Sequence, residues 1–447
     1  MDILQEILRD EDYLISQRRF FHTHPSVTGH EESTIADLSE RLSELGIRHT
    51  VVPDGGIFAF IEGKGYENSP DDADIRTVLL RADVDALPVQ ESENNLARKK
   101  VCVSENPGVC HACGHDSHMA MILSAAKFLV SHREAIHGRV ILMFERGEEG
   151  PNNIIELYHY IQEKGIHIDS SYACHIYSYL DSGLFSLRPG PVMAGGVFFS
   201  IRLIGKGGHG SRPDLSLSPI DCYVAIHRAL SEFRMRKLDP FHAFTFAMGS
   251  VHAGLVDNVI PQELTFSGNA RLYDLEDGVL FRDYLIETLD NCCAQYGCRW
   301  EECYIAGPKL PVVNDPECTL LAKEAVGAVI GKERITEADP WMACETICTT
   351  LAKWPGVLAL LGTRNPEKGT GAAHHNGSFD VDEDVMKYGA AAAAAYALAF
   401  LDSGIDPSPR ADKRSFAELF RVAGYTPEAC NYLEGGPKPP FFGRNPL

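Results

Sequence analysis

The spacing of apolar positions predicts that helices and strands alternate along the first 190 residues of the chain. Apolar residues recur at helical spacing near the N-terminus, and a second amphipathic segment ends at Gly46. Runs rich in β-branched and aromatic residues predict strands. In order, the expected elements are helices over 3–21 and 33–45, strands within 49–63 and 76–88, a helix over 118–134 and a strand over 139–149. This order is typical of an α/β domain.

The pattern changes after the Pro- and Gly-containing stretch 186–196. A strand that begins at Val197, a long helix, two more strands and a helix near 276–295 predict an inserted α+β domain. Helices and apolar strands return after about residue 307, as expected if the chain re-enters its first domain. The predicted segments are 1–192 for the first part of the main domain, 193–306 for the inserted domain, and 307–447 for the second part with a C-terminal tail.

Composition and charge narrow the function classes. A chain of 447 residues exceeds what one hydrophobic core usually supports, which agrees with two domains. The net charge of -21 opposes nonspecific binding to nucleic acid or to an anionic membrane, so neither is an expected partner. The longest apolar stretch, from Gly389 to Leu401, is shorter than the roughly 20 residues that span a bilayer and predicts a buried helix.

The N-terminus and the cysteines predict a cytoplasmic protein. The first residues are acidic and lack the cationic start and unbroken apolar run of an export signal. The odd total of 13 scattered cysteines does not resemble a disulfide framework.

One short stretch, CHACGHDSH at 110–118, concentrates metal-capable side chains. By chance, the chain's 13 Cys and 18 His would place about 0.6 of them in a window of this length. Cys113 and His115 are two positions apart, so in an extended segment they would face one side and could share a metal. A redox pair of Cys110 and Cys113 lacks a thioredoxin-like context, and a closed structural zinc site lacks a second ligand pair nearby.

Two consecutive carboxylates, Glu148 and Glu149, end the strand predicted over 139–149. Neighbours on an extended chain point to opposite sides, so one could bind a metal while the other faces a metal-bound water. That division suits hydrolysis, because a metal lowers the pKa of its bound water and an unligated carboxylate can then transfer the proton. Taken alone, such a pair is more often solvated surface, and an isolated histidine is more often packed or exposed than a ligand.

Eight blocks, taken together and in order, resemble the signature of the metal-dependent aminoacylase and auxin-conjugate hydrolase family. They are FHTHPSVTGHE, LRADVDALPVQE, CHACGHDSHMA, FERGEEG, LRPGPVMAG, GKGGHGSRP, DNVIPQELTFSGNAR and HHNGSFDVDED. They extend from residue 20 to about residue 400, so the resemblance covers most of the chain. It implies a zinc-peptidase-like α/β catalytic domain, an inserted α+β lid that commonly forms a homodimer, and a small-molecule substrate.

Transferred block by block, the resemblance implies roles for individual residues. Glu148 is the implied general acid and base, and Asp85 the carboxylate that orients a ligand. In the lid, His209 is implied to reach the oxyanion across a dimer, with Asn258 and Arg271 near the substrate carboxylate. His375 fits the spacing of its block better than His374 does. The implied metal ligands are Cys113, His115, Glu149, His175 and His375.

The chain departs from the family pattern at two places. The family usually has Phe-Gln-Pro-Ala before its Glu pair, whereas this chain has FERG at 144–147. Arg146 thus places a permanent cation near Glu148, where it could bind an acidic substrate, depress the pKa of the base or form a surface ion pair. A block around Cys344 likewise differs from the Ser-Glu-Asp-Phe type. Substrate contacts are therefore expected to differ from those of an ordinary aminoacylase.

The expected function is metal-dependent hydrolysis of a C–N bond in a small carboxylate-bearing substrate, an N-acyl or aryl-conjugated amino acid. One alternative is hydrolytic deamination of an electron-poor amino-aromatic acid with release of ammonia, as in the divergent 5-nitroanthranilate aminohydrolase branch. Another is a metal-binding scaffold without catalysis. Mixed Cys, His and carboxylate ligands can hold Mn²⁺ or Zn²⁺, and one or two ions per subunit are expected.

Overall fold

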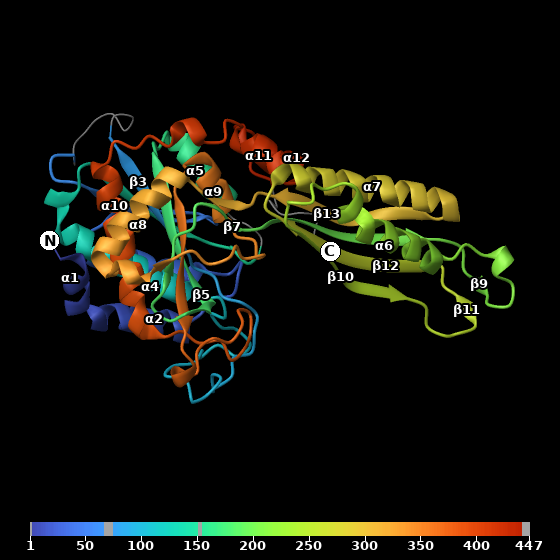
Figure 1. Cartoon of the computed structure of the whole chain (residues 1–447), viewed down its shortest axis with the longest axis horizontal. Helices are drawn as coiled ribbons and strands as arrows, with labels where there is room; N and C mark the ends of the chain where they lie inside the picture. The colour runs from blue at the N-terminus through green and yellow to red at the C-terminus, as the bar shows by residue number, and fades with distance from the viewer. Residues whose placement is uncertain (1, 67–74, 151–153, 440–447) are drawn as a thin grey trace. The chain divides into compact units, whose positions relative to one another are not determined.

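The computed structural model describes residues 2–66, 75–150 and 154–439, and the chain divides into two compact units (Figure 1). Unit 1 comprises Met1–Val192, Val313–Asp339 and Thr349–Lys413, and unit 2 comprises Met193–Val312, Pro340–Cys348 and Arg414–Leu447. The stretches 340–348 and 414 onwards, expected with the first domain, group with unit 2. Hydrogen bonds explain this grouping: the Tyr273 hydroxyl donates to the Pro340 carbonyl, and the Gly307 N–H donates to that of Ala423.

Unit 1 is built on an eight-stranded mixed sheet. Strand β3 runs parallel to β4 and β5, and β5 runs parallel to β16, so the carboxyl ends of these four strands share one edge. Every residue of β2, β3 and β4 is buried, as in sheets that are covered on both faces. The strand order is β1 (Arg48–Val52), β2 (Gly56–Glu62), β4 (Arg139–Glu145), β3 (Thr77–Asp83), β5 (Ser170–Asp181), β16 (Val357–Arg364), β6 (Phe185–Ser186) and β15 (Ile335–Thr336).

Helices complete the core of unit 1 and confirm the predicted α/β class. The apolar run at 389–401 lies in a buried helix, as predicted, and packs against α4. A Cβ on Gly389 would lie 2.1 Å from the sulfur of Met121, so a larger residue at this position would require the flexible Met121 side chain to move. The helices are α1 (Ile3–Arg9), α2 (Glu11–Thr23), α3 (Glu32–Glu44), α4 (His115–Ser131), α5 (Ile154–Lys164), α8 (Pro316–Ile330), α9 (Ile347–Lys353) and α10 (Met386–Asp402). Helix α9 belongs to unit 1 from Thr349 onwards.

Unit 2 has the α+β character expected of the inserted segment. Its antiparallel sheet has the order β10 (Phe244–Ala253), β12 (Glu263–Leu272), β8 (Gly195–Ile204) and β13 (Arg299–Lys309). Alternate residues of β8, from Val197 to Leu203, are fully buried against helices α6 (Pro219–Arg236) and α7 (Leu275–Tyr296). Its shorter elements are β9 (Gly208–His209), paired with β11 (Val259–Ile260), and helices α11 (Phe416–Val422) and α12 (Pro427–Leu433). Strand β7 (Gly190–Met193) pairs with β14 (Val312–Asn314), and a boundary between the units falls within each of these strands.

Within the described residues, no helix is both long enough and apolar enough to cross a membrane.

Candidate metal centre

Metal-capable side chains converge where β3, β4, β5 and β16 reach the same edge of the unit 1 sheet. The carboxyl ends of parallel strands are where open α/β sheets usually bind ligands. Asp83 ends β3 and Asp85 follows it, and Glu148 and Glu149 follow β4. The other contributors are His175 within β5, His374 and His375 after β16, and Cys113 and His115 at the start of α4.

The geometry of the CHACGHDSH stretch differs from the extended segment that we expected. Cys113 lies in a turn, and His115 is the first residue of α4. Gly114 between them has φ +90°, a left-handed conformation that favours glycine. A Cβ at this position would also lie 3.1 Å from the side chain of Ile176. The turn at Gly114, rather than strand alternation, therefore determines where the two side chains lie.

Two groups of ligand atoms share Glu149. In one group, atoms of Cys113, Glu149 and His375 lie within 4.8 Å of one another, and in the other, atoms of His115, Glu148 and Glu149 do. Glu148 and Glu149 lie in a turn beyond β4, not on an extended strand as predicted. Both carboxylates therefore reach the same cluster instead of facing opposite sides.

Asp85 links the two groups. One of its carboxylate oxygens lies 3.2 Å from Nδ1 of His115, and the other accepts a 2.9 Å hydrogen bond from the backbone N–H of Glu149. The contact with Nδ1 directs the other ring nitrogen, Nε2, toward the cluster. Nε2 of His115 is buried, has no hydrogen-bond partner among the described residues, and lies 4.0 Å from a Glu149 oxygen. These contacts are those that a ligand-orienting carboxylate makes.

Sequence reasoning missed two supporting residues, Asp83 and His118. The Nε2 atom of His118 accepts a 2.9 Å hydrogen bond from the N–H of Ile176, so its Nδ1 donates to Asp83 at 2.6 Å. Both ring nitrogens of His118 are thus engaged, and it supports the cluster rather than adding a donor. The signal was present in the sequence, because His118 is three positions after His115 on a helix and Asp83 is two positions before Asp85 on an extended stretch.

The consecutive histidines after β16 diverge. His375, whose φ is +62°, places Nε2 2.9 Å from a Glu149 oxygen. His374 instead lies with Nδ1 3.6 Å from the sulfur of Cys113, and its Nε2 accepts a 3.2 Å hydrogen bond from the N–H of Ser178. The Nε2 of His175 lies 3.8 Å from the same sulfur. The choice of His375 over His374 as a ligand stays a prediction, which the shared group with Cys113 and Glu149 supports.

This donor set fits a divalent transition metal. A thiol, imidazoles and carboxylates are the ligands that Zn²⁺ and Mn²⁺ take in mixed sites. Burial lowers the pKa of His115, but the nearby Asp83 and Asp85 carboxylates outweigh it and raise that pKa to about 10. Burial, together with Glu149, raises the pKa of the Cys113 thiol. His115 and Cys113 therefore carry protons that a bound metal would displace.

Metal binding at pH 7 is expected to release roughly two protons per chain, because His115 and Cys113 are both protonated without metal and must ligate in deprotonated form. Affinity should accordingly fall as pH falls. Titration calorimetry of Mn²⁺ or Zn²⁺ into chelator-treated protein, in two buffers of different ionisation enthalpy, measures the released protons. Cys113→Ser should release about one fewer, and a binding heat that is independent of the buffer would contradict the expectation.

Arg146 lies in a buried ion pair. Its Nε donates to Glu31 at 2.8 Å and its Nη2 to Glu32 at 2.6 Å, and its side chain is 6% exposed. Of its three predicted roles, an ion pair agrees best with the structure, although only its Glu32 partner is on the surface, at 68% exposure, while Glu31 is buried. The expected contact with substrate has no support in this geometry, because two carboxylates already hold the guanidinium.

The residues assigned to the lid lie in unit 2. His209 on β9 pairs with Val259 on β11, and the adjacent Asn258 accepts a hydrogen bond from the Gly210 N–H through its carbonyl. Arg271 on β12 donates to the Asn269 side chain and to the sulfur of Cys344. Their roles toward substrate stay predictions.

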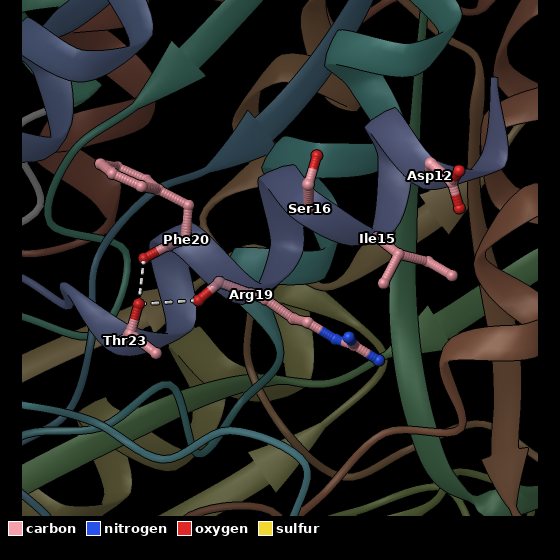
Figure 2. Close-up of a pocket in the computed structure, with 6 residues that line it drawn as sticks. All are labelled: Asp12, Ile15, Ser16, Arg19, Phe20 and Thr23. Carbon is pink, nitrogen blue, oxygen red and sulfur yellow. Dashed lines mark hydrogen bonds between the residues drawn. The ribbon is translucent and has the colours of Figure 1, made fainter.

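A separate hollow of about 420 Å³ lies along α2 (Figure 2). All of its lining residues come from this one helix, and the Thr23 hydroxyl is satisfied by the carbonyls of Arg19 and Phe20. None of them belongs to the metal-capable groups, so the hollow offers no converging chemistry.

Comparison with known proteins shows the family of the chain. Residues 79–401 match the model of peptidase family M20/M25/M40. The chain is 35% identical to thermostable carboxypeptidase 2 of Saccharolobus solfataricus over 90% of this chain and 99% of that protein. It is 28% identical to IAA-amino acid hydrolase ILR1-like 4 of Arabidopsis thaliana, over 87% and 86% of the two chains.

Among solved structures, the chain resembles the YXEP protein of Bacillus subtilis, described as a dinuclear metal-binding peptidase of the M20 family. The TM-score is 0.69 at 26% identity, covering 87% of this chain and 97% of that one. The protein is thus a metal-dependent hydrolase of C–N bonds, and it belongs to peptidase family M20/M25/M40.

Proposed function

We propose that the protein hydrolyses the amide bond of a small carboxylate-bearing substrate, an N-acyl or aryl-conjugated amino acid. The observation that carries this proposal is the position of Glu149, which shares one ligand group with Cys113 and His375 and another with His115 and Glu148. Similarity to an IAA-amino acid hydrolase supports a conjugated amino acid as the substrate class.

In this proposal, one or two Mn²⁺ or Zn²⁺ ions bind to Cys113, His115, Glu149, His175 and His375. Bound there, the metal would lower the pKa of a water and polarise the substrate carbonyl. Asp85 keeps Nε2 of His115 directed into the cluster through its contact with Nδ1. The same Asp85 accepts a hydrogen bond from the N–H of Glu149, which holds the backbone that carries the shared carboxylate.

Glu148 is the proposed general acid and base. Its carboxylate lies in a ligand group with His115 and Glu149, yet neither Cys113 nor His375 shares that group with it. It would accept one proton from the attacking water and deliver that proton to the leaving nitrogen, so the amine departs neutral and the carboxylate is regenerated.

Further parts of the proposal concern assembly and compartment. A homodimer through unit 2 is proposed, because β10 is an edge strand that pairs only with β12 within the described sheet, and unpaired edges favour strand pairing. His209, Asn258 and Arg271 would contact the substrate. A cytoplasmic enzyme is supported by its 13 cysteines, all of which are free.

The test is product analysis with purified, Mn²⁺- or Zn²⁺-loaded protein. The substrates are N-acetyl and N-benzoyl amino acids and electron-poor aminobenzoates, and the released carboxylic acid, amino acid and ammonia are all measured. Equal amounts of carboxylic acid and amino acid are expected from the acyl substrates. Ammonia from an aminobenzoate, without cleavage of acyl substrates, would instead assign a deaminase. No product from any substrate, in protein shown to bind metal, would contradict the proposal.

A further inference from the structure

Strand β5 extends beyond the metal centre with two tyrosines on one face. Side chains of a strand alternate, so His175, Tyr177 and Tyr179 project to the same side of β5. The two tyrosine rings meet edge to face, with centroids 5.5 Å apart and planes at 70°. The chain thus places an aromatic pair directly after a candidate metal ligand.

His374 joins this pair to the metal centre. Its ring centroid lies 6.5 Å from that of Tyr177, 6.1 Å from that of Tyr179 and 5.7 Å from that of His175. Its Nδ1 is 3.6 Å from the sulfur of Cys113. We call Tyr177, Tyr179 and His374 the aromatic ridge. It leads from the cluster to Tyr179 without interruption.

Buried groups hold His374 of the aromatic ridge in place, and the two tyrosines of the ridge are exposed to different degrees. The buried Phe379 packs on His374 with a centroid separation of 5.0 Å, and the N–H of Ser178 donates to Nε2 of the same histidine. Tyr179 is 49% exposed and Tyr177 is partly exposed. Single exposed apolar residues are ordinary, but a fixed aromatic cluster continuous with a polar site is typical of ligand pockets.

We propose that Tyr177 and Tyr179 form a subsite for an aromatic ring of the substrate and make the enzyme selective for aryl-acyl over small alkyl-acyl amino acids. A flat ring gains both apolar burial and edge-to-face or offset-stacked contact there, whereas an acetyl group has too little surface to reach both tyrosines. This inference rests on the proposed amide hydrolysis, and it adds the class of the acyl group.

The test compares N-benzoylglycine with N-acetylglycine as substrates of the wild type, Tyr179→Ala and Tyr179→Phe. Tyr179→Ala is expected to raise KM for the benzoyl substrate by about two- to tenfold, the range of an aromatic pair contact, with kcat and the acetyl substrate unchanged. Tyr179→Phe keeps the ring and should restore the wild-type KM. Phe241→Ala, which removes a 95% exposed ring of unit 2, is the control and should alter neither substrate.

An equal loss for both substrates, or no loss for the benzoyl substrate, would overturn the subsite. Calorimetric binding of benzoate and acetate to the metal-loaded protein supplies a readout that needs no turnover. Benzoate should bind the wild type more tightly than Tyr179→Ala by the same factor, and acetate should not distinguish them. If neither amide is hydrolysed but benzoate still binds the wild type more tightly than Tyr179→Ala, the proposed amide hydrolysis is wrong while the aromatic subsite stands. Equal binding of benzoate to both proteins rejects the subsite alone.

Discussion

Replacing Glu148 with glutamine is expected to lower kcat by about 10²- to 10⁴-fold, the usual contribution of a general acid or base. The amide of glutamine is close in size to the carboxylate but cannot accept the proton of the attacking water. The bound metal should be unchanged, because Glu148 is not among the proposed ligands. Initial rates with a cleaved acyl substrate, combined with metal analysis of the same preparation, measure both quantities.

Its neighbour Glu149 provides the matched comparison. Glu149→Gln removes the carboxylate that both ligand groups share, so metal content and activity should fall together. Equal loss of metal in the two variants would make Glu148 a ligand instead of the base. Full activity in Glu148→Gln would remove it from the mechanism altogether.

Replacing Arg18 with methionine is expected to lower the free energy of unfolding by about 3 kcal/mol, the lower end of the cost of removing one partner of a buried ion pair, because Asp116 keeps its contact with His22. Arg18 is 2% exposed at its side chain, and its guanidinium lies 2.9 Å from Asp116 and 3.2 Å from Glu383. Asp116 directly follows His115 on α4 and is fully buried, so without Arg18 it cannot recover hydration and depends on the 2.8 Å contact of its carboxylate with Nδ1 of His22. Urea denaturation followed by circular dichroism measures the change.

The adjacent Arg19 is the control for this substitution. Its side chain is 43% exposed and it also pairs with Glu383, so Arg19→Met should cost at most about 1 kcal/mol, as surface ion pairs do. Similar small effects of both variants would mean that the charge of Asp116 does not depend on Arg18.

The periodicity of apolar residues was sufficient to predict the fold class, because in a compact chain a long apolar run such as the one in α10 must be buried. It failed where single residues redirect the backbone. The left-handed Gly114 turns the chain into α4, and the turn beyond β4 brings Glu148 and Glu149 to one cluster. Alternation along an extended strand does not describe either place, and glycines such as Gly114 and Gly147 indicate that a turn is possible without indicating its direction.

The environment of Arg146 could not be predicted for another reason. Its partners, Glu31 and Glu32, precede it by more than a hundred positions and lie at the start of α3. Which carboxylates surround a cation depends on how the elements pack, and a single sequence does not contain that information. The spacing of His118 and Asp83 indicated that both could lie near the site, but the hydrogen bonds of His118 with Asp83 and with the N–H of Ile176 depend on packing.

The contact of α10 with α4 connects the residue volume at Gly389 with the packing of the helix that begins with His115. His115 begins α4, and Met121 in the same helix leaves no space for a methyl group at Gly389. A larger residue at Gly389 would therefore first displace the flexible Met121 side chain, and it would shift α4 only where that side chain has no other space to occupy. The alanine-rich helix α10 thus supports the element that carries His115, and substitutions in it should be assessed by bound metal as well as by stability.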